Sequence, residues 1–361
     1  MTSDSFNKKR KSLMSNKSRK SITSSPKDID IRLRSAMMAQ SNQNNYGYKA
    51  RKSLTHRGIV VTRKIAATLQ GSIYRGKYTD SNGKIYDVAI KRADVVLTRN
   101  GVGRTRNQKY CKVAENISKE YNLMQYISNN KYKPKGILKP YKFINDGINY
   151  FIVMEYGGTS LFRHVMKYHS LIKQNIMSID EWGKHVKIIF KQMCIILNYL
   201  HNKVHCCHLD ISLENFTIDN TIFKNGKFIK HGNIYLIDYG LSEYFGKNNA
   251  SFECSKFVGK VHCQSPEIRS RNVFNAQLSD IWSLGCVLFM MLMNSLPMNV
   301  ASKNDEHFCN IVNGHLKQML LDTNKIQYID SECIDLLNKM LTIEKKRINI
   351  KNIVKHKYYL L

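Results

Sequence analysis

The pattern of apolar and polar positions changes about sixty residues into the chain. Residues 1–60 show no apolar periodicity and are rich in Ser, Lys, Arg and Asn. Such a segment buries too little apolar surface to offset the conformational entropy lost on ordering. We therefore predict a disordered, basic segment over residues 1–60 and a folded part over residues 61–361.

Alternating apolar residues in the first hundred folded positions predict a small sheet. The predicted strands are residues 65–78, 84–92, 141–144 and 150–155. The first two are joined at Asn82-Gly83, a dipeptide that favours a tight hairpin turn. Apolar residues at helical spacing predict one helix over residues 113–127. Beyond Gly158 the pattern becomes that of long helices, most clearly over residues 182–201, so a larger helical part follows the sheet.

The formal net charge of +30 is large, and residues 1–64 alone carry 16 Lys and Arg against 3 Asp and Glu. Two interpretations stay open: solvated lysines on exposed faces, which we favour for the folded part, or attraction to a polyanion. The basic N-terminal segment suits an acidic partner, and we do not expect nucleic acid as the primary partner. Lys8-Lys9-Arg10-Lys11 is either a nuclear localisation signal or a generic basic tail.

The apolar runs and the cysteines predict a protein that does not insert into a membrane and has no disulfide framework. No uninterrupted apolar run reaches the roughly 18 residues that cross a bilayer, so we expect no membrane insertion. The nine cysteines show no Cys-x-x-Cys spacing, which gives no sign of a zinc site or a disulfide framework. We expect reduced thiols and a location in the cytoplasm, the nucleus or both.

The most informative chemistry lies in two short motifs. Asp210 and Asn215 stand five residues apart, and Asp238 precedes Tyr239-Gly240. Mg-dependent phosphoryl transfer needs such a set: one carboxylate accepts the proton of the attacking hydroxyl, while an amide oxygen and a second carboxylate hold the metal. Asp210 is the candidate base, and Asn215 and Asp238 are the candidate metal ligands.

These motifs resemble those of the eukaryotic protein kinase family, Ser/Thr type, in a divergent branch. The resemblance implies an α+β, bilobal protein kinase fold. A small β-rich N-lobe with one helix would span about residues 61–156, and a larger, mainly α-helical C-lobe about residues 157–361. It also implies ATP and Mg²⁺, protein substrates, and transfer of the γ-phosphate to serine or threonine hydroxyls.

The resemblance places a nucleotide site around Lys91, in Val88-Ala89-Ile90-Lys91. A buried lysine needs a counter-charge, and we expect it from Glu120, with Glu115 as the alternative. The residues expected to contact the nucleotide are Ile65, Gly71, Ile73, Ala89, Lys91, Met154, Glu155, Gly157 and Thr217.

Two nucleotide-site positions depart from the family pattern. Gly71 corresponds to the third glycine of the phosphate-covering loop, but Ala66 and Thr68 stand at the first two positions. Because glycine lets a backbone approach phosphates closely, we expect a stiffer loop with poorer phosphate contacts. Thr217 replaces the usual leucine below the adenine and makes this surface more polar.

Three catalytic-centre positions also depart from it. Leu209 replaces the arginine that pairs with a phosphorylated activation loop, so we predict activity that does not require this phosphorylation. Ser212 replaces a lysine that touches the transferred phosphate, and Lys260 stands where the family has a threonine. Our hypothesis is an exchange in which Lys260 supplies the missing ammonium; the alternative is that Lys260 points to solvent.

Distant residues complete the resemblance. Asp280 is expected to anchor the catalytic loop, and Glu267 and Arg347 to form a buried ion pair. Residues 95–109 and 220–233 are predicted surface-loop inserts without an assigned function. The alternative to a kinase is a pseudokinase, a scaffold that binds nucleotide without efficient transfer; a charge-driven nucleic-acid-binding protein is more remote.

Overall fold

The computed structural model describes residues 54–105, 107–246, 253–254, 257–271 and 273–360. The predicted disorder of residues 1–53 lies outside this part of the chain. Residues 54–60, which we assigned to the disordered segment, are instead part of the N-lobe. Leu54 and Ile59 are buried in an apolar cluster on one face of its sheet, at 3% and 1% exposure.

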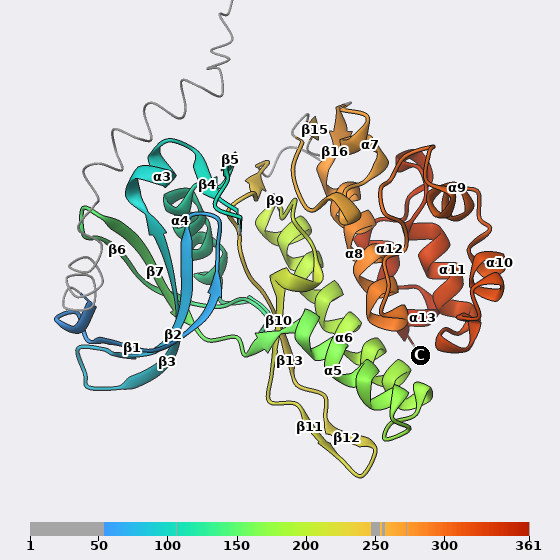
Figure 1. The fold of residues 1–361 in the computed structure, drawn as a ribbon, viewed down its shortest axis with the longest axis horizontal. Helices are drawn as coiled ribbons and strands as arrows, with labels where there is room; N and C mark the ends of the chain where they lie inside the picture. The colour runs from blue at the N-terminus through green and yellow to red at the C-terminus, as the bar shows by residue number, and fades with distance from the viewer. Residues whose placement is uncertain (1–53, 106, 247–252, 255–256, 272, 361) are drawn as a thin grey trace, which may run out of the picture. The chain divides into compact units, whose positions relative to one another are not determined.

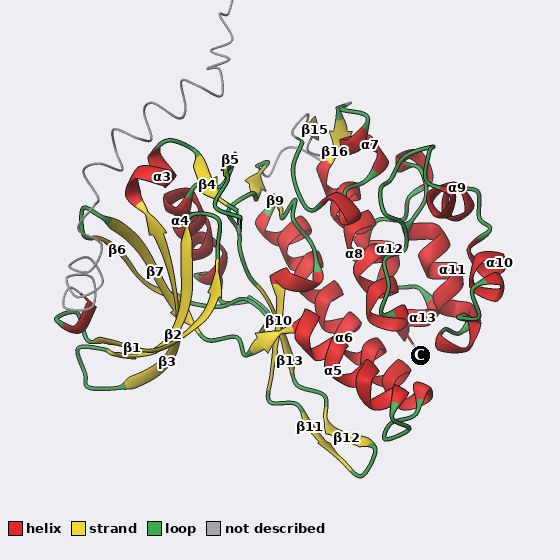
Figure 2. Cartoon of the chain, viewed as in Figure 1, coloured by secondary structure: helices red, strands yellow, loops and turns green. Residues whose placement is uncertain are grey.

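The N-lobe is built on a five-stranded antiparallel sheet in the order β1-β2-β3-β7-β6 (Figures 1 and 2). Its strands are β1 Ile59–Ala67, β2 Gly71–Thr79, β3 Ile85–Asp94, β6 Pro140–Asn145 and β7 Asn149–Glu155. The single strand predicted over residues 65–78 is wrong, because a tight turn at Thr68 to Gly71 divides it into β1 and β2.

The predicted N-lobe helix is present as α4, Ile117–Ser128. It begins four residues later than predicted because Asn116 caps it: the Asn116 side chain accepts a hydrogen bond from the Lys119 amide. Glu120 therefore lies in the first turn, where it is buried at 1% exposure.

The first insert is not the surface loop that we predicted. Residues 95–112 form helix α3, Val95–Arg99, and a hairpin of β4, Val102–Arg104, and β5, Tyr110–Lys112. Asp94 caps α3 by accepting from the amides of Val96 and Leu97. The buried side chains of Val95, Leu97 and Val102 give the insert an apolar anchor.

The second insert, residues 220–233, is a hairpin of β11, Ile222–Lys224, and β12, Lys227–Lys230. Its Phe228 is 8% exposed and packs into the large C-lobe core, so this insert too is anchored on one side. Ile222 and Ile229 are exposed.

The C-lobe is mainly helical (Figure 2). Its α-helices are α5 Leu161–Lys173, α6 Ile179–Tyr199, α7 Pro266–Arg269, α8 Ala276–Met293, α9 Glu306–Val312, α10 Leu316–Asp322, α11 Ser331–Met340, α12 Ile350–Ile353 and α13 Lys357–Leu360. The helix predicted over residues 182–201 is α6, which starts at a Ser178 cap and continues into a π-helical turn, Leu200–Val204. Helix α8 is long and apolar enough to cross a membrane, but 89% of it is buried within the protein, as expected of a core helix.

Short strands in the C-lobe pair segments that are distant in the sequence. Strands β8 Thr159–Ser160, β10 Phe216–Asp219 and β13 Asn233–Leu236 form one small sheet. Strand β9, Cys206–Cys207, pairs with β14, Glu243–Tyr244, and β15, Glu253–Cys254, pairs with β16, Phe274–Asn275. The segment between β13 and α7 is thereby paired with the strand that precedes the Asp210 loop and with the strand that leads into α8.

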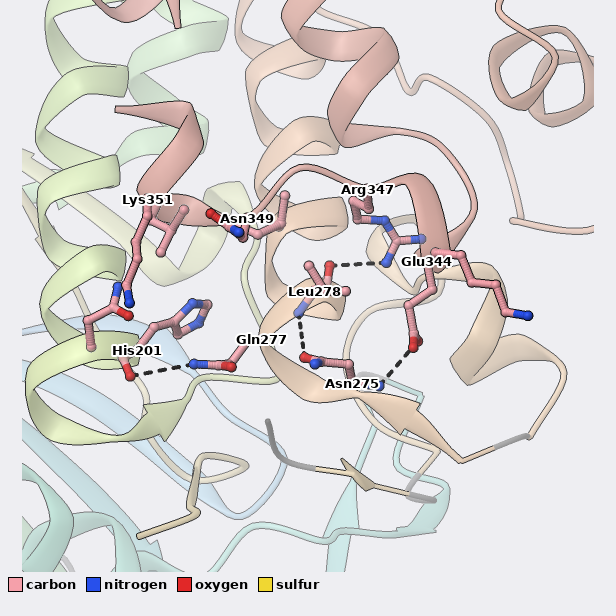
Figure 3. A pocket seen from close by; sticks show the side chains of 12 residues that line it. His201, Asn275, Gln277, Leu278, Glu344, Arg347, Asn349 and Lys351 are labelled. Atoms are coloured by element: carbon pink, nitrogen blue, oxygen red, sulfur yellow. Dashed lines mark hydrogen bonds between the residues drawn. The ribbon is translucent and has the colours of Figure 1, made fainter. Parts of the chain in front are cut away.

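The predicted ion pair between Glu267 and Arg347 is present at 2.8 Å. Arg347 also donates to the carbonyls of Leu278 and Thr342, so the buried guanidinium is well satisfied. Beside it lies a polar pocket of about 390 Å³ (Figure 3). None of the residues that line this pocket is among the predicted site residues, so it is distinct from the predicted nucleotide site.

Three histidines form a hydrogen-bonded chain in the C-lobe. The His164 and His185 Nε2 atoms are 2.8 Å apart, and the His185 and His231 Nδ1 atoms are 2.9 Å apart. Phe228 stacks on the His185 ring at 3.7 Å between centroids. Burial lowers the pKa of His164 to about 3 and that of His185 to about 2, so both rings are neutral near pH 7.

These lowered pKa values predict acid-sensitive stability. The unfolded chain binds protons at His164 and His185 below about pH 6.5, whereas the folded protein does not. The free energy of unfolding therefore decreases as the pH is lowered below this value. The two histidines together contribute about 2 to 3 kcal/mol per pH unit below that value. Urea unfolding at several pH values should show a smaller slope for the His164→Phe, His185→Phe double variant. The exposed His56→Gln variant is the control, and equal slopes in all three proteins would contradict the prediction.

Candidate active site

The loop that carries Asp210 is held by α8. Asp280, 1% exposed on this helix, accepts hydrogen bonds from the amides of His208 and Leu209, both at 2.8 Å. The His201 Nε2 atom lies 3.0 Å from the same carboxylate. The anchoring expected of Asp280 is thus observed, whereas His201 was not anticipated; a histidine in the π-helical turn after α6 gives no signal by itself.

Asp210 and Asn215 lie in direct contact. The Asn215 side-chain amide donates to the Asp210 carboxylate at 2.6 Å and to the Asp210 carbonyl at 2.7 Å. Asn215 ends a 3-10 turn, Leu213–Asn215, and is 5% exposed. Because its amide nitrogen is used by Asp210, its oxygen is left for a cation.

Lys260 points into this site and not to solvent. Its Nζ donates to the Asp210 carboxylate at 3.1 Å and to the Ser212 hydroxyl at 2.9 Å. Its backbone amide donates to the other oxygen of the Asp210 carboxylate at 3.2 Å. Ser212 is fully buried, so its hydroxyl and the Asp210 carboxylate together fix the lysine head group.

Lys91 on β3 lies among three carboxylates. Its Nζ is 2.8 Å from Glu120 and 2.8 Å from Asp238, and 3.9 Å from Glu115. Burial alone would lower the pKa of Lys91, but the charges of Asp238 and Glu120 outweigh it and raise that pKa, so the ammonium stays charged. Burial raises the pKa of Glu120. Of the two partners considered from sequence, Glu120 makes the close contact, and Glu115 contributes at longer range.

Four residues of the predicted nucleotide set share one face of the N-lobe sheet. Ile73 lies opposite Lys91 across β2 and β3, and Met154 lies opposite Ala89 across β3 and β7. Ala89 and Lys91 are two apart on β3, so their side chains project to the same side. Directly opposite residues also share a face, which places all four together.

The remaining predicted nucleotide residues lie on β1, at the start of β2, at and just beyond the end of β7, and on β10 of the C-lobe. Ile65 falls at an irregularity in the β1–β2 pairing, and Glu155 ends β7, where its carboxylate accepts from the Lys139 amide at 2.8 Å. Gly157 approaches Thr217 so closely that a Cβ there would lie 2.5 Å from the Thr217 hydroxyl. That hydroxyl is buried and has no hydrogen-bond partner among the described residues.

Gly71 is required by packing. A Cβ at this position would lie 2.0 Å from the carbonyl oxygen of Arg92 on β3. The glycine therefore permits β2 to approach β3 at the beginning of the strand. This role is separate from any contact of the loop with phosphates.

Tyr239 follows Asp238 directly and packs beside the catalytic loop. Its ring is 1% exposed and meets the His208 ring edge-on at 5.3 Å between centroids. The Tyr239 hydroxyl donates to the Leu236 carbonyl at 3.4 Å. Burial raises the pKa of Tyr239, so the phenol is neutral.

Asn215 and Asp238 offer an amide oxygen and a carboxylate as metal ligands. Hard divalent cations such as Mg²⁺ prefer oxygen ligands of this kind, so these two residues fit the group that the motifs imply. Lys91 takes one oxygen of the Asp238 carboxylate. The site therefore combines a buried ammonium with oxygen ligands.

Comparison with known proteins agrees with this geometry. The family model described as protein kinase domain matches residues 71–359. A probable serine/threonine-protein kinase of Dictyostelium discoideum, fhkB, is 26% identical over 312 residues, which are 85% of this chain and 24% of that protein. The human SNF-related serine/threonine-protein kinase is 25% identical, over 61% of this chain and 25% of that protein.

A third relative is viral. The putative serine/threonine-protein kinase R517/R518 of Acanthamoeba polyphaga mimivirus is 24% identical over 78% of this chain and 58% of that protein. The chain thus spans between about a quarter and three fifths of the length of these three relatives. The family match covers most of the chain and both lobes, and the chain belongs to the protein kinase domain family.

Proposed function

We propose that this protein is a serine/threonine kinase that uses ATP and Mg²⁺ to phosphorylate protein substrates. The observation that carries the proposal is that the two motif carboxylates, Asp210 and Asp238, are each held by a lysine. The Asp210 carboxylate is held by Asn215 and Lys260, and the Asp238 carboxylate is 2.8 Å from the Lys91 ammonium. Phosphoryl transfer depends mainly on such positioning and charge stabilisation.

Asp210 is the proposed base. The hydroxyl oxygen of the substrate forms a bond to the γ-phosphorus as its proton passes to the Asp210 carboxylate. The bond from the γ-phosphorus to the bridging oxygen breaks, and ADP leaves with that electron pair. The 2.6 Å hydrogen bond from Asn215 supports this role because it fixes the orientation of the carboxylate.

Lys91 and Glu120 are proposed to bind and orient the nucleotide phosphates. The buried ammonium is held in place by Glu120 at 2.8 Å and remains charged, as an anionic ligand requires. Asn215 and Asp238 are proposed to hold Mg²⁺, which neutralises phosphate charge when bound. Ile65, Gly71, Ile73, Ala89, Met154, Glu155, Gly157 and Thr217 are the proposed contacts to the rest of the nucleotide.

Lys260 is the proposed replacement for the lysine absent at Ser212. A positive charge near the transferred phosphate stabilises the charge that develops in the transition state. The Lys260 ammonium, bonded to both Asp210 and Ser212, is close enough to the proposed base to supply it. The Ser212 hydroxyl correspondingly takes the polar role of the family's threonine.

Leu209 supports activity without phosphorylation of the activation loop. It is 4% exposed in an apolar cluster whose other members include Phe245, Val258 and Phe274. Residues 245 and 258 belong to the segment between β13 and α7, so apolar packing joins this segment to the catalytic loop. In the family, an arginine at position 209 would make that connection through a phosphate.

A pseudokinase is the second candidate. The alanine and threonine at positions 66 and 68 favour weak nucleotide contacts, and so does the Thr217 hydroxyl, which finds no partner in the described part of the chain. Under that alternative the protein binds nucleotide with Mg²⁺ and transfers nothing. The acidic partner and the cellular location expected from the N-terminal charge stay predictions.

The first test is phosphate transfer from labelled ATP with Mg²⁺ to a mixture of basic proteins. The Asp210→Asn variant should lose transfer and keep nucleotide binding, because only the proton acceptor is removed. Transfer that persists in this variant would exclude Asp210 as the base. Nucleotide binding without any transfer by the unmodified protein would establish the pseudokinase alternative.

Removing the Lys260 charge should slow the chemical step. We expect Lys260→Met to lower kcat by about 10²- to 10³-fold, with a smaller change in KM for ATP, because the ammonium acts on the transition state. The measurement is steady-state kinetics.

Two further variants serve as a control and as a rescue for Lys260→Met. The exposed Lys303→Met should retain the original kcat. The double variant Ser212→Lys, Lys260→Thr restores the family arrangement and should be faster than Lys260→Met alone. An unchanged kcat in Lys260→Met would rule out the exchange.

Dephosphorylation should leave turnover unchanged. Active protein is treated with a serine/threonine phosphatase, phosphosites are mapped by mass spectrometry, and kcat is compared before and after.

Leu209→Ala, which opens a cavity in the apolar cluster, should instead lower both activity and the free energy of unfolding, the latter by about 2 to 4 kcal/mol. If removal of a phosphate from the activation loop abolished turnover in the unsubstituted protein, it would contradict the proposal that activity does not require this phosphorylation.

A further inference from the structure

The turn between β1 and β2, which corresponds to the family's phosphate-covering loop, is bound to the first insert. The Arg104 amide on β4 donates to the Leu69 carbonyl at 2.6 Å. The Asp94 amide, at the end of β3 and just before the insert, donates to the Gln70 carbonyl at 2.9 Å. Leu69 and Gln70 are the two residues at the tip of the turn, so both of its carbonyls are held.

The Gln70 side chain adds a third bond. It is 7% exposed, and its Nε2 donates to the Val102 carbonyl at 3.1 Å. A glutamine at the exposed tip of a hairpin would ordinarily be solvated. Its burial here shows that the β4–β5 hairpin covers the tip (Figure 1).

The packing between the two segments is close. A Cβ at Gly103 would lie 2.7 Å from the Leu69 Cβ and 2.7 Å from the Val113 side chain. Only a glycine therefore lets the β4 backbone approach the turn. The two hydrogen bonds that join the insert to the turn, at Arg104 and Val102, and this close contact make the insert a brace for the turn.

The brace fixes the direction of one backbone amide. A trans peptide is planar, and its C=O and N–H groups point in opposite directions. Because the Leu69 carbonyl faces Arg104, the Gln70 N–H of the same peptide points away from the insert. This N–H has no acceptor among the described residues, so it is available to an anion.

We propose that the insert of residues 95–112 holds the turn so that the Gln70 N–H binds a phosphate oxygen of the nucleotide, with the Gln70 side chain as the positioning group. The inference rests on the proposed function. It accounts for a loop that has Ala66 and Thr68 in place of two glycines: an externally fixed turn needs no backbone freedom to approach the phosphates. The conformational entropy of the turn is then lost when the protein folds, and binding of the nucleotide does not have to offset it.

The test compares two ligands in the full chain. Gln70→Met keeps the size of the side chain and removes its donor. Calorimetry should show binding of ATP with Mg²⁺ weakened by about three- to tenfold, the effect of one net hydrogen bond. Binding of adenosine, which lacks phosphates, should be unchanged.

Other variants separate positioning from general damage. Gly103→Val should displace the hairpin from the turn, weaken ATP binding in the same selective way, and increase hydrogen exchange of residues 66–72. Lys109→Ala, exposed in the same hairpin, is the matched control and should leave both affinities unchanged.

The outcomes distinguish the brace from the kinase function itself. Unchanged ATP binding in both brace variants, or an equal loss for ATP and adenosine, would overturn the inference while leaving the kinase proposal standing. A chain that binds neither ligand before any substitution would overturn both. A selective loss for ATP supports the brace, whether or not the protein transfers phosphate.

Discussion

The buried charge of Lys91 is the constraint on which this site depends. An ammonium at 8% exposure is costly unless it is paired, and here it is paired from two directions. Glu120 comes from α4 in the N-lobe, and Asp238 follows β13 in the C-lobe, each 2.8 Å from the same nitrogen. One charge therefore ties helix α4 to the sheet and one lobe to the other.

Departures from the family's motifs are matched by changes in their neighbours. Ser212 lacks a positive charge, and Lys260 brings one to within 2.9 Å of the serine hydroxyl. Leu209 lacks the charge of an arginine, and the segment that such a charge would hold contributes Phe245 and Val258 to an apolar cluster around it. A lysine from a distant segment thus supplies the charge missing at position 212, and apolar packing stands where the family has a charged contact at position 209.

Leu209 also illustrates how packing offsets local strain. Its backbone has φ of +64°, a left-handed conformation that costs a non-glycine residue about 1 to 2 kcal/mol. Burial of a leucine side chain contributes about 1.5 to 3 kcal/mol, and the two Asp280 hydrogen bonds hold the backbone amides of Leu209 and of the residue before it. The conformation persists because neighbouring elements determine it.

The sequence by itself determined the features that depend on local pattern and motif order. The Asn82-Gly83 turn, with Gly83 at φ of +77°, the helix α6, the bilobal fold and the spacing of Asp210, Asn215 and Asp238 belong to this group. Turn chemistry and apolar periodicity act over a few residues, and motif order identifies a family. These signals do not require a view of the folded chain.

Only the tertiary structure decided the contacts between distant segments. It divided residues 65–78 at a turn, gave the first insert a helix and a hairpin, and selected Glu120 over Glu115 as the close partner of Lys91. It also directed the Lys260 side chain to Asp210, 50 positions earlier in the chain. Each outcome depends on which surfaces meet after folding, and no periodicity along the chain encodes that.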